Sequence, residues 1–116
     1  MSSRQRFFIS IDDLQKARGD ISSIAFHGVS PDAFAEALQT ALRDPGLWEQ
    51  WRALQPDPDE VDPGTGQSDP EATVTAKQSD LITEAQVITN LPHAILSHRL
   101  GLLIGPHWKL RDVSAV

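Results

Sequence analysis

The amino-acid sequence predicts an α+β protein in which N-terminal helices pack on a small sheet that contains a C-terminal βαβ unit. Before residue 55, apolar residues recur at the spacing of amphipathic helices, whereas after residue 72 Val, Ile and Thr alternate as they do in strands. Between these parts, residues 56–72 are rich in Pro, Gly and acidic residues, which is typical of a flexible, disordered loop or linker. Because the chain has 116 residues, we expect residues 1–116 to form a single small domain that this loop interrupts.

Two helices are predicted before the acidic loop. The first begins at Ser30, because a Ser N-cap followed by Pro at the first helical position is a typical helix start. A second, shorter helix follows with Asp44 as its cap. Upstream, RFFISI could be a strand and SIDDLQKARGD a capped helical turn, and periodicity alone does not separate the two. The apolar stripe of the first helix consists of Phe34, Leu38, Ala41 and Leu42.

A strand, a helix and a second strand are predicted after the loop. Residues 82–89 suit a strand, Pro92 opens a helix that ends near Gly105, and residues 107–113 form the last strand. The two strands of such a βαβ unit run parallel, with a right-handed crossover. An extra strand from residues 72–77 or from the N-terminus could lie between them, which gives a split βαβ of the ferredoxin-like type.

The charge of the chain is concentrated in the loop. The formal net charge is −6, and six acidic residues lie between Arg52 and Lys77 with no basic residue among them. Without these six, ten acidic residues face ten basic ones, so the folded part is close to neutral. The six are Asp57, Asp59, Glu60, Asp62, Asp69 and Glu71.

A calcium loop is excluded by its spacing. Asp57 and Asp59 repeat the first two ligand positions of an EF-hand, but Asp62 stands where the sharp turn needs Gly. Ser68 occupies the position of the closing Glu. We therefore expect a mobile tether rather than a metal site.

The composition also indicates the compartment. There is no Cys, which excludes disulfides and thiolate chemistry, and the short apolar patch at the N-terminus ends at Asp12. No apolar run reaches the length that spans a membrane. We expect a soluble, cytoplasmic protein.

No residue pattern indicates catalysis, a metal or a cofactor. His93 and His98 are five positions apart, which turns them roughly 140° from one another on a helix and prevents a shared metal. Ser30 and Ser97 stand in no nucleophile elbow, and a single Gly28 before a helix does not make a phosphate-binding loop. We therefore expect a protein that is not an enzyme.

The best candidate surface for a protein partner lies on the second helix. If its apolar face is only partly buried, the rest docks a protein, and the acidic tether steers a basic partner towards it. The alternative is that the same face simply closes the core. This face consists of Leu47, Trp48, Trp51 and Leu54.

The last strand offers a different site, for an anion or metabolite. With a period of two, His107, Lys109 and Arg111 point to one face, whereas Trp108 and Leu110 point to the core. The three basic side chains could bind an acidic ligand, but the positive charge of the C-terminal part is too weak to favour nucleic acid. The sequence therefore predicts a small interaction or regulatory module, with an anion-binding sensor as the alternative.

Overall fold

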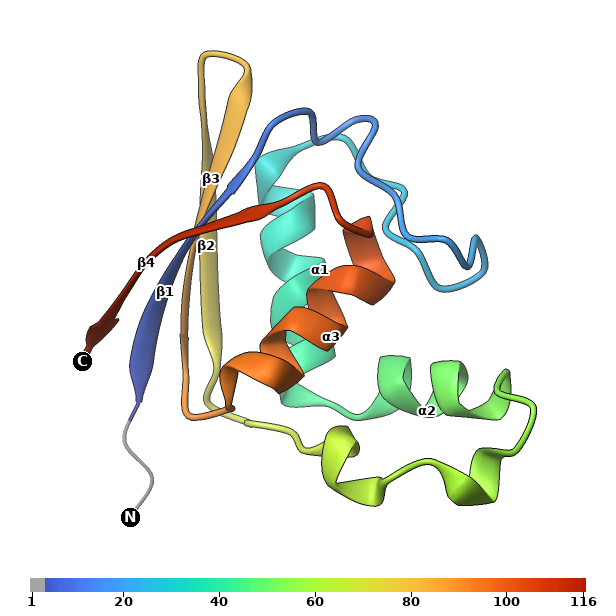
Figure 1. Ribbon diagram of the computed structural model, residues 1–116. Helices are drawn as coiled ribbons and strands as arrows, with labels where there is room; N and C mark the ends of the chain where they lie inside the picture. Colours follow the sequence, from blue (N-terminus) through green and yellow to red (C-terminus); the bar gives the residue numbers. More distant parts are fainter. Residues whose placement is uncertain (1–3) are drawn as a thin grey trace.

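A computed structural model describes residues 4–116 and shows, over these residues, an α+β fold with three helices and a four-stranded antiparallel sheet (Figure 1). The helices all lie on one face of the sheet, and the other face is uncovered. The elements are β1 Gln5–Ile11, α1 Pro31–Arg43, α2 Gly46–Ala53, β2 Thr73–Ser79, β3 Ile82–Thr89, α3 His93–Ile104 and β4 Lys109–Ala115.

The N-terminal strand lies in the middle of the sheet. The strand order is β2-β3-β1-β4, and β1 pairs antiparallel with both β3 and β4. The strands β3 and β4, which α3 connects, therefore run parallel with β1 between them. The N-terminal segment RFFISI, which periodicity left ambiguous, is thus a strand, and it is the one inserted between β3 and β4. Residues 73–79, the other candidate for that place, pair with β3 at the edge of the sheet.

Local signals fix the ends of α1 and α3, as predicted. The Ser30 hydroxyl accepts a hydrogen bond of 3.1 Å from the N–H of Ala33, which satisfies a free donor in the first turn of α1. Gly105 ends α3 with φ 65°, in the left-handed region that favours Gly. A Cβ at this position would stand 2.8 Å from the carbonyl oxygen of Arg18, so packing also requires Gly here.

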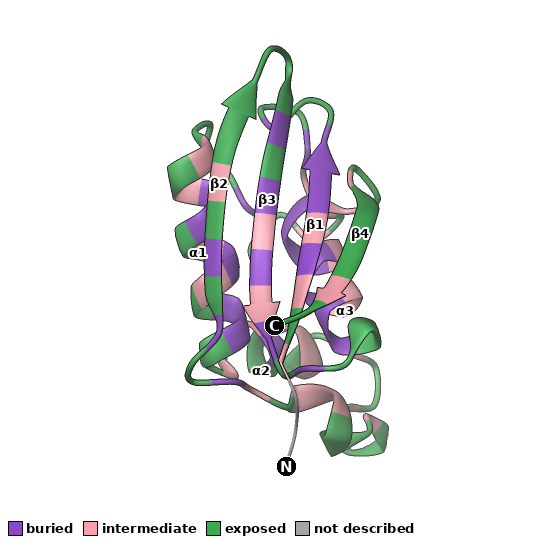
Figure 2. Ribbon diagram, turned by 90° about the vertical axis from the view of Figure 1, so that its left-hand side faces the viewer, coloured by how far each residue is buried: buried purple, intermediate pink, exposed green. Residues whose placement is uncertain are grey.

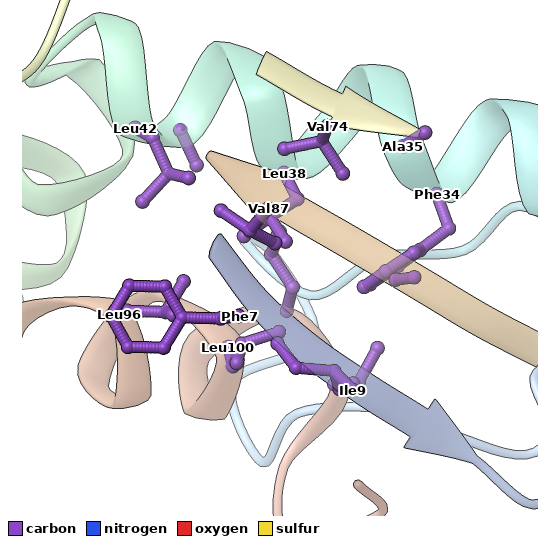
Figure 3. Packing of buried hydrophobic residues seen from close by; sticks show 14 of the residues in the cluster. Phe7, Ile9, Phe34, Ala35, Leu38, Leu42, Val74, Val87, Leu96 and Leu100 are labelled. Carbon is purple, nitrogen blue, oxygen red and sulfur yellow. The ribbon is translucent and has the colours of Figure 1, made fainter. Parts of the chain in front are cut away.

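The core fills the space between the sheet and the helices α1 and α3 (Figure 3). Alternate residues of β1 point into the core, and the residues of β3 that pair with them point the same way. Each of these two strands therefore buries one of its faces against the helices. The predicted stripe of α1 is fully buried there. Labelled members of this cluster are Phe7, Ile9, Phe34, Ala35, Leu38, Leu42, Val74, Val87, Leu96 and Leu100.

The last strand differs from its prediction in two respects. It spans Lys109–Ala115 rather than 107–113, and its pairing with β1 shifts between Phe8 and Ile9, which leaves Arg111 as the extra residue of a β-bulge. The prediction that Leu110 anchors the core is wrong, because Leu110 is 38% exposed on an edge strand whose residues are mostly exposed (Figure 2). Trp108, which precedes the strand, is partly buried against the core.

The acidic segment follows a defined path with two short 3₁₀ turns, Pro58–Glu60 and Pro63–Gly66. Its mobility stays a prediction that needs a measurement of dynamics. None of the helices in residues 4–116 combines the length and the apolar character that crossing a membrane requires.

Candidate functional site

The predicted partner-binding face of α2 is divided between core and surface. Trp48 is 7% exposed, and its Nε1–H donates a hydrogen bond of 2.9 Å to the hydroxyl of Thr65. Gly66 lies so close that a Cβ there would stand 2.8 Å from the Trp48 ring. Leu47 is partly buried and packs against the core. These two residues fit the core-closing alternative.

The other two residues of this face remain accessible. Leu54 is 55% exposed. Trp51 is half-buried, and its ring meets the imidazole of His98 edge to face, with 4.4 Å between the ring centroids. The four residues therefore do not form one continuous apolar surface.

Trp51 lines a hollow of about 580 Å³ that α2, α3 and the loop after β1 enclose. Gly101 forms part of its wall, and a Cβ added there would meet no atom within 4 Å, so the hollow has room for a larger side chain. Polar groups of three kinds reach its surface: a carboxylate, a hydroxyl and an imidazole. Its lining residues are Asp20, Ile21, Trp51, Ala94, Ser97, His98, Gly101 and Leu102.

Burial and then the positive charge of Arg99 lower the pKa of His98 below its usual value. The imidazole is therefore neutral at neutral pH, and its Nδ1 is buried with no hydrogen-bond partner among residues 4–116. No hydrogen bond joins His98 to Ser97 or Asp20 in the described part of the chain. These groups line one hollow, as a binding site requires, without forming the linked nucleophile and base that covalent catalysis needs.

A buried guanidinium connects α3 to the acidic segment. Arg99 is fully buried, and its two terminal nitrogens donate hydrogen bonds to the backbone carbonyls of Thr65 at 3.0 Å and Gln67 at 2.9 Å. Burial lowers the pKa of Arg99, and within residues 4–116 it has no carboxylate partner. Sequence reasoning missed this contact, although an Arg within the apolar run ILSHRLGLL was a usable signal.

A second residue that sequence reasoning misses is Asp69, because composition places it among the acids of the predicted tether. Asp69 is 1% exposed, and its carboxylate receives two hydrogen bonds from Arg4, at 2.8 and 3.0 Å. The Thr89 hydroxyl donates a further one at 2.8 Å. Asp69 therefore joins the start of β1 to the end of β3.

The three residues of the predicted anion site do not share one hollow. His107 and Lys109 line a hollow of about 350 Å³ together with Asp12, Asp13 and Lys16, so two carboxylates offset its two ammonium groups. Arg111 lines a different hollow, on the uncovered face of the sheet.

Residues 4–116 contain no group of three or more His, Cys, Asp or Glu side chains that could hold a metal ion. Comparison of the chain with protein-family models, with curated proteins and with solved structures finds no match.

Proposed function

We propose that this protein is a small binding module, not an enzyme, that docks a basic segment of a partner protein in the hollow beside Trp51. The observation that carries the proposal is the half-exposed indole of Trp51 at the edge of a hollow with an acidic lining residue, Asp20. Trp is enriched among the residues that dominate binding energy, because it offers a large rigid surface.

The arrangement of α2 supports a role for Trp51 outside the core. Trp48, three positions earlier, is buried against the turn that contains Thr65 and Gly66. Trp51 instead contacts His98 across the hollow. Its side chain is thus available to a partner without exposing buried residues.

The charge around the hollow favours a basic partner. Arg52 donates a hydrogen bond of 2.9 Å to the carbonyl of Pro58 and lies 3.8 Å from the Asp59 carboxylate, which ties the acidic segment to the end of α2. The carboxylates that follow are exposed, and an exposed acidic flank accelerates encounter with a basic segment. These exposed acids are Asp57, Asp59, Glu60 and Asp62.

The chemistry of the hollow suits a Lys or Arg side chain on an apolar stem. A cation can lie over the indole of Trp51 while Asp20 provides the opposite charge. His98 stays neutral and does not repel it. Ile21 and Leu102 offer apolar surface to the stem.

A matched pair of substitutions at one position tests this function. Gly101→Leu fills the hollow, whereas Gly101→Ala adds one methyl group and controls for the gain in helix propensity. Fluorescent peptides with a central Lys or Arg between apolar residues should bind wild type and Gly101→Ala, but bind Gly101→Leu about tenfold or more weakly. Equal binding to all three proteins, or binding only of acidic peptides, would contradict the proposal.

We also infer that the β3-α3-β4 unit is a split βαβ of the ferredoxin-like type. The strand order supports this arrangement, because β1 lies between the two strands that α3 connects. An experimentally determined structure in which β3 and β4 are direct neighbours would refute it.

A further inference from the structure

We propose that the uncovered face of the sheet binds a small anion with a flat apolar body, in a hollow between Arg111 and Lys77. The proposal is independent of the function assigned to the Trp51 hollow, because the two sites lie on opposite sides of the sheet. The hollow measures about 570 Å³ and draws residues from all four strands. This volume lies within the range of small-molecule sites.

Arg111 supplies the positive charge. It is the extra residue of the bulge in β4, and bulges commonly re-aim a side chain next to a functional site. Its guanidinium has no hydrogen bond or ion pair with residues 4–116, so its planar set of donors is available. That planar set matches the two oxygens of a carboxylate or phosphate.

Ser10 supplies an accessible hydroxyl in the same hollow. It is only 7% exposed, yet its hydroxyl makes no side-chain hydrogen bond within the described part of the chain. The hydroxyl oxygen is not among the buried side-chain atoms that lack a partner, so it is accessible from the hollow and free to donate to a ligand. An anionic oxygen that Arg111 holds could accept this hydrogen bond.

Phe8 provides an apolar surface beside these groups. It is half-buried on β1, opposite Gln86 of β3, and lines the hollow. A flat ring can stack on it while the acidic group of the ligand meets Arg111. Lys77 lies on the other side, 4.0 Å from the Glu84 carboxylate, so the hollow keeps one positive charge in excess.

The same features favour a small ligand over single-stranded nucleic acid. A nucleic-acid platform stacks several successive bases on several aromatic rings. In the described strands, Phe8 is the aromatic residue on the uncovered face, because Phe7 points into the core. The single ring of Phe8 and the single unpaired guanidinium of Arg111 therefore match a ligand with one flat ring and one acidic group.

Titration by NMR with phenyl phosphate and benzoate as probes tests the proposal. Both should shift the amide signals of Phe8, Ser10, Gln86 and Arg111, and phenyl phosphate should bind more tightly than inorganic phosphate or benzyl alcohol. Arg111→Gln should weaken binding about tenfold, the effect of one lost charge-assisted contact. Lys109→Gln removes the same charge from the same strand outside this hollow and should change affinity less than about twofold.

Ser10→Ala separates binding from folding. Because the hydroxyl has no partner in the described chain, its removal should leave the free energy of unfolding unchanged or raised. The same substitution should weaken the binding of phenyl phosphate. Equal losses in the Arg111 and Lys109 variants would show unspecific attraction and overturn the proposal. Tighter binding of a uridine oligonucleotide through the same residues would replace it with nucleic-acid recognition.

Discussion

At Asp69, hydrogen bonds outweigh the effect of burial on a carboxylate. Burial alone would raise its pKa, but hydrogen bonds from Arg4, from the Thr89 hydroxyl and from the backbone N–H groups of Asn90 and Glu71 lower the pKa to about 2. The usual value is 3.8. A carboxylate with these partners stabilises the folded state only while it is ionised.

We expect Asp69→Asn to lower the free energy of unfolding by about 2–4 kcal/mol, because it weakens a buried network and leaves Arg4 without its main partner. Glu71→Gln is the matched control, since Glu71 also pairs with Arg4 at 3.0 Å but is exposed, and it should cost less than about 1 kcal/mol. Urea unfolding at neutral pH measures both. Similar losses in the two variants would contradict the buried role of Asp69.

The same residue predicts acid sensitivity. Because its folded pKa is depressed, the contribution of Asp69 to stability is fully present above the unfolded value of 3.8 and is lost as the pH falls towards about 2. The contribution amounts to about 2 kcal/mol. Unfolding curves between pH 5 and pH 2 should therefore converge for wild type and Asp69→Asn, whereas a constant difference would refute the linkage.

Two Trp residues three positions apart should respond differently to truncation. Trp48→Ala removes a buried ring and should cost about 3–5 kcal/mol. Trp51→Ala removes a half-buried ring and should cost about 1–2 kcal/mol while leaving a folded protein. Chemical denaturation measures the free energy of unfolding of both variants. An equal loss in the two would show that Trp51 stabilises the fold as a core residue.

At the scale of elements, the turn Pro63–Gly66 is held to the helices by a small number of polar contacts. The Thr65 hydroxyl accepts the hydrogen bond of Trp48, and the Thr65 carbonyl accepts one from Arg99. A short turn with such contacts exchanges its amide protons more slowly than an exposed one. We therefore expect slower exchange at residues 63–69 than at residues 57–61.

Thr65→Val tests this attachment, because it keeps the shape of the side chain and removes the hydroxyl. The Trp48 N–H is then left without its partner, at a cost of about 1–3 kcal/mol, and the turn should exchange faster. Thr65→Ser keeps the hydroxyl and should retain most of the protection. Hydrogen exchange measures both, and fast exchange across residues 56–72 in wild type would support the tether instead.

Elements with local signals could be predicted from the sequence. Ser30 before Pro31 and Gly105 before Pro106 mark helix ends through contacts within a few residues, and the structure confirms these ends. The strand Ile82–Thr89 also agrees with its alternating pattern. Local chemistry alone decides such features.

The candidate sites depended on pairings that are distant in sequence. Arg99 meets Thr65 across 34 positions, and Arg4 meets Asp69 across 65. The bulge at Arg111 arises from its pairing with β1, at the other end of the chain. Neither composition nor periodicity contains this information, so the separation of Trp48 from Trp51, and of Arg111 from His107, could not be predicted.

At the scale of the whole molecule, charge is unevenly distributed between the two sides. The acidic segment near α2 carries exposed carboxylates, whereas Arg6, Lys109 and Arg111 lie in the strands β1 and β4. Added salt should therefore weaken the binding of basic peptides at the Trp51 hollow and the binding of anions on the sheet to a similar extent, because both sites are exposed. The net charge of −6 by itself indicates only the binding of basic peptides.

The pairing of β1 with β4 brings both ends of the described chain together, since the N–H of Val116 donates to the carbonyl of Arg4 at 3.3 Å. The ends can therefore be joined by a short linker, and the chain reopened in the hairpin between β2 and β3. Asp80 and Leu81 at that tip are exposed, as tolerated cut sites are. Such a circular permutant should fold with a native amide spectrum, whereas one reopened within β1 should not.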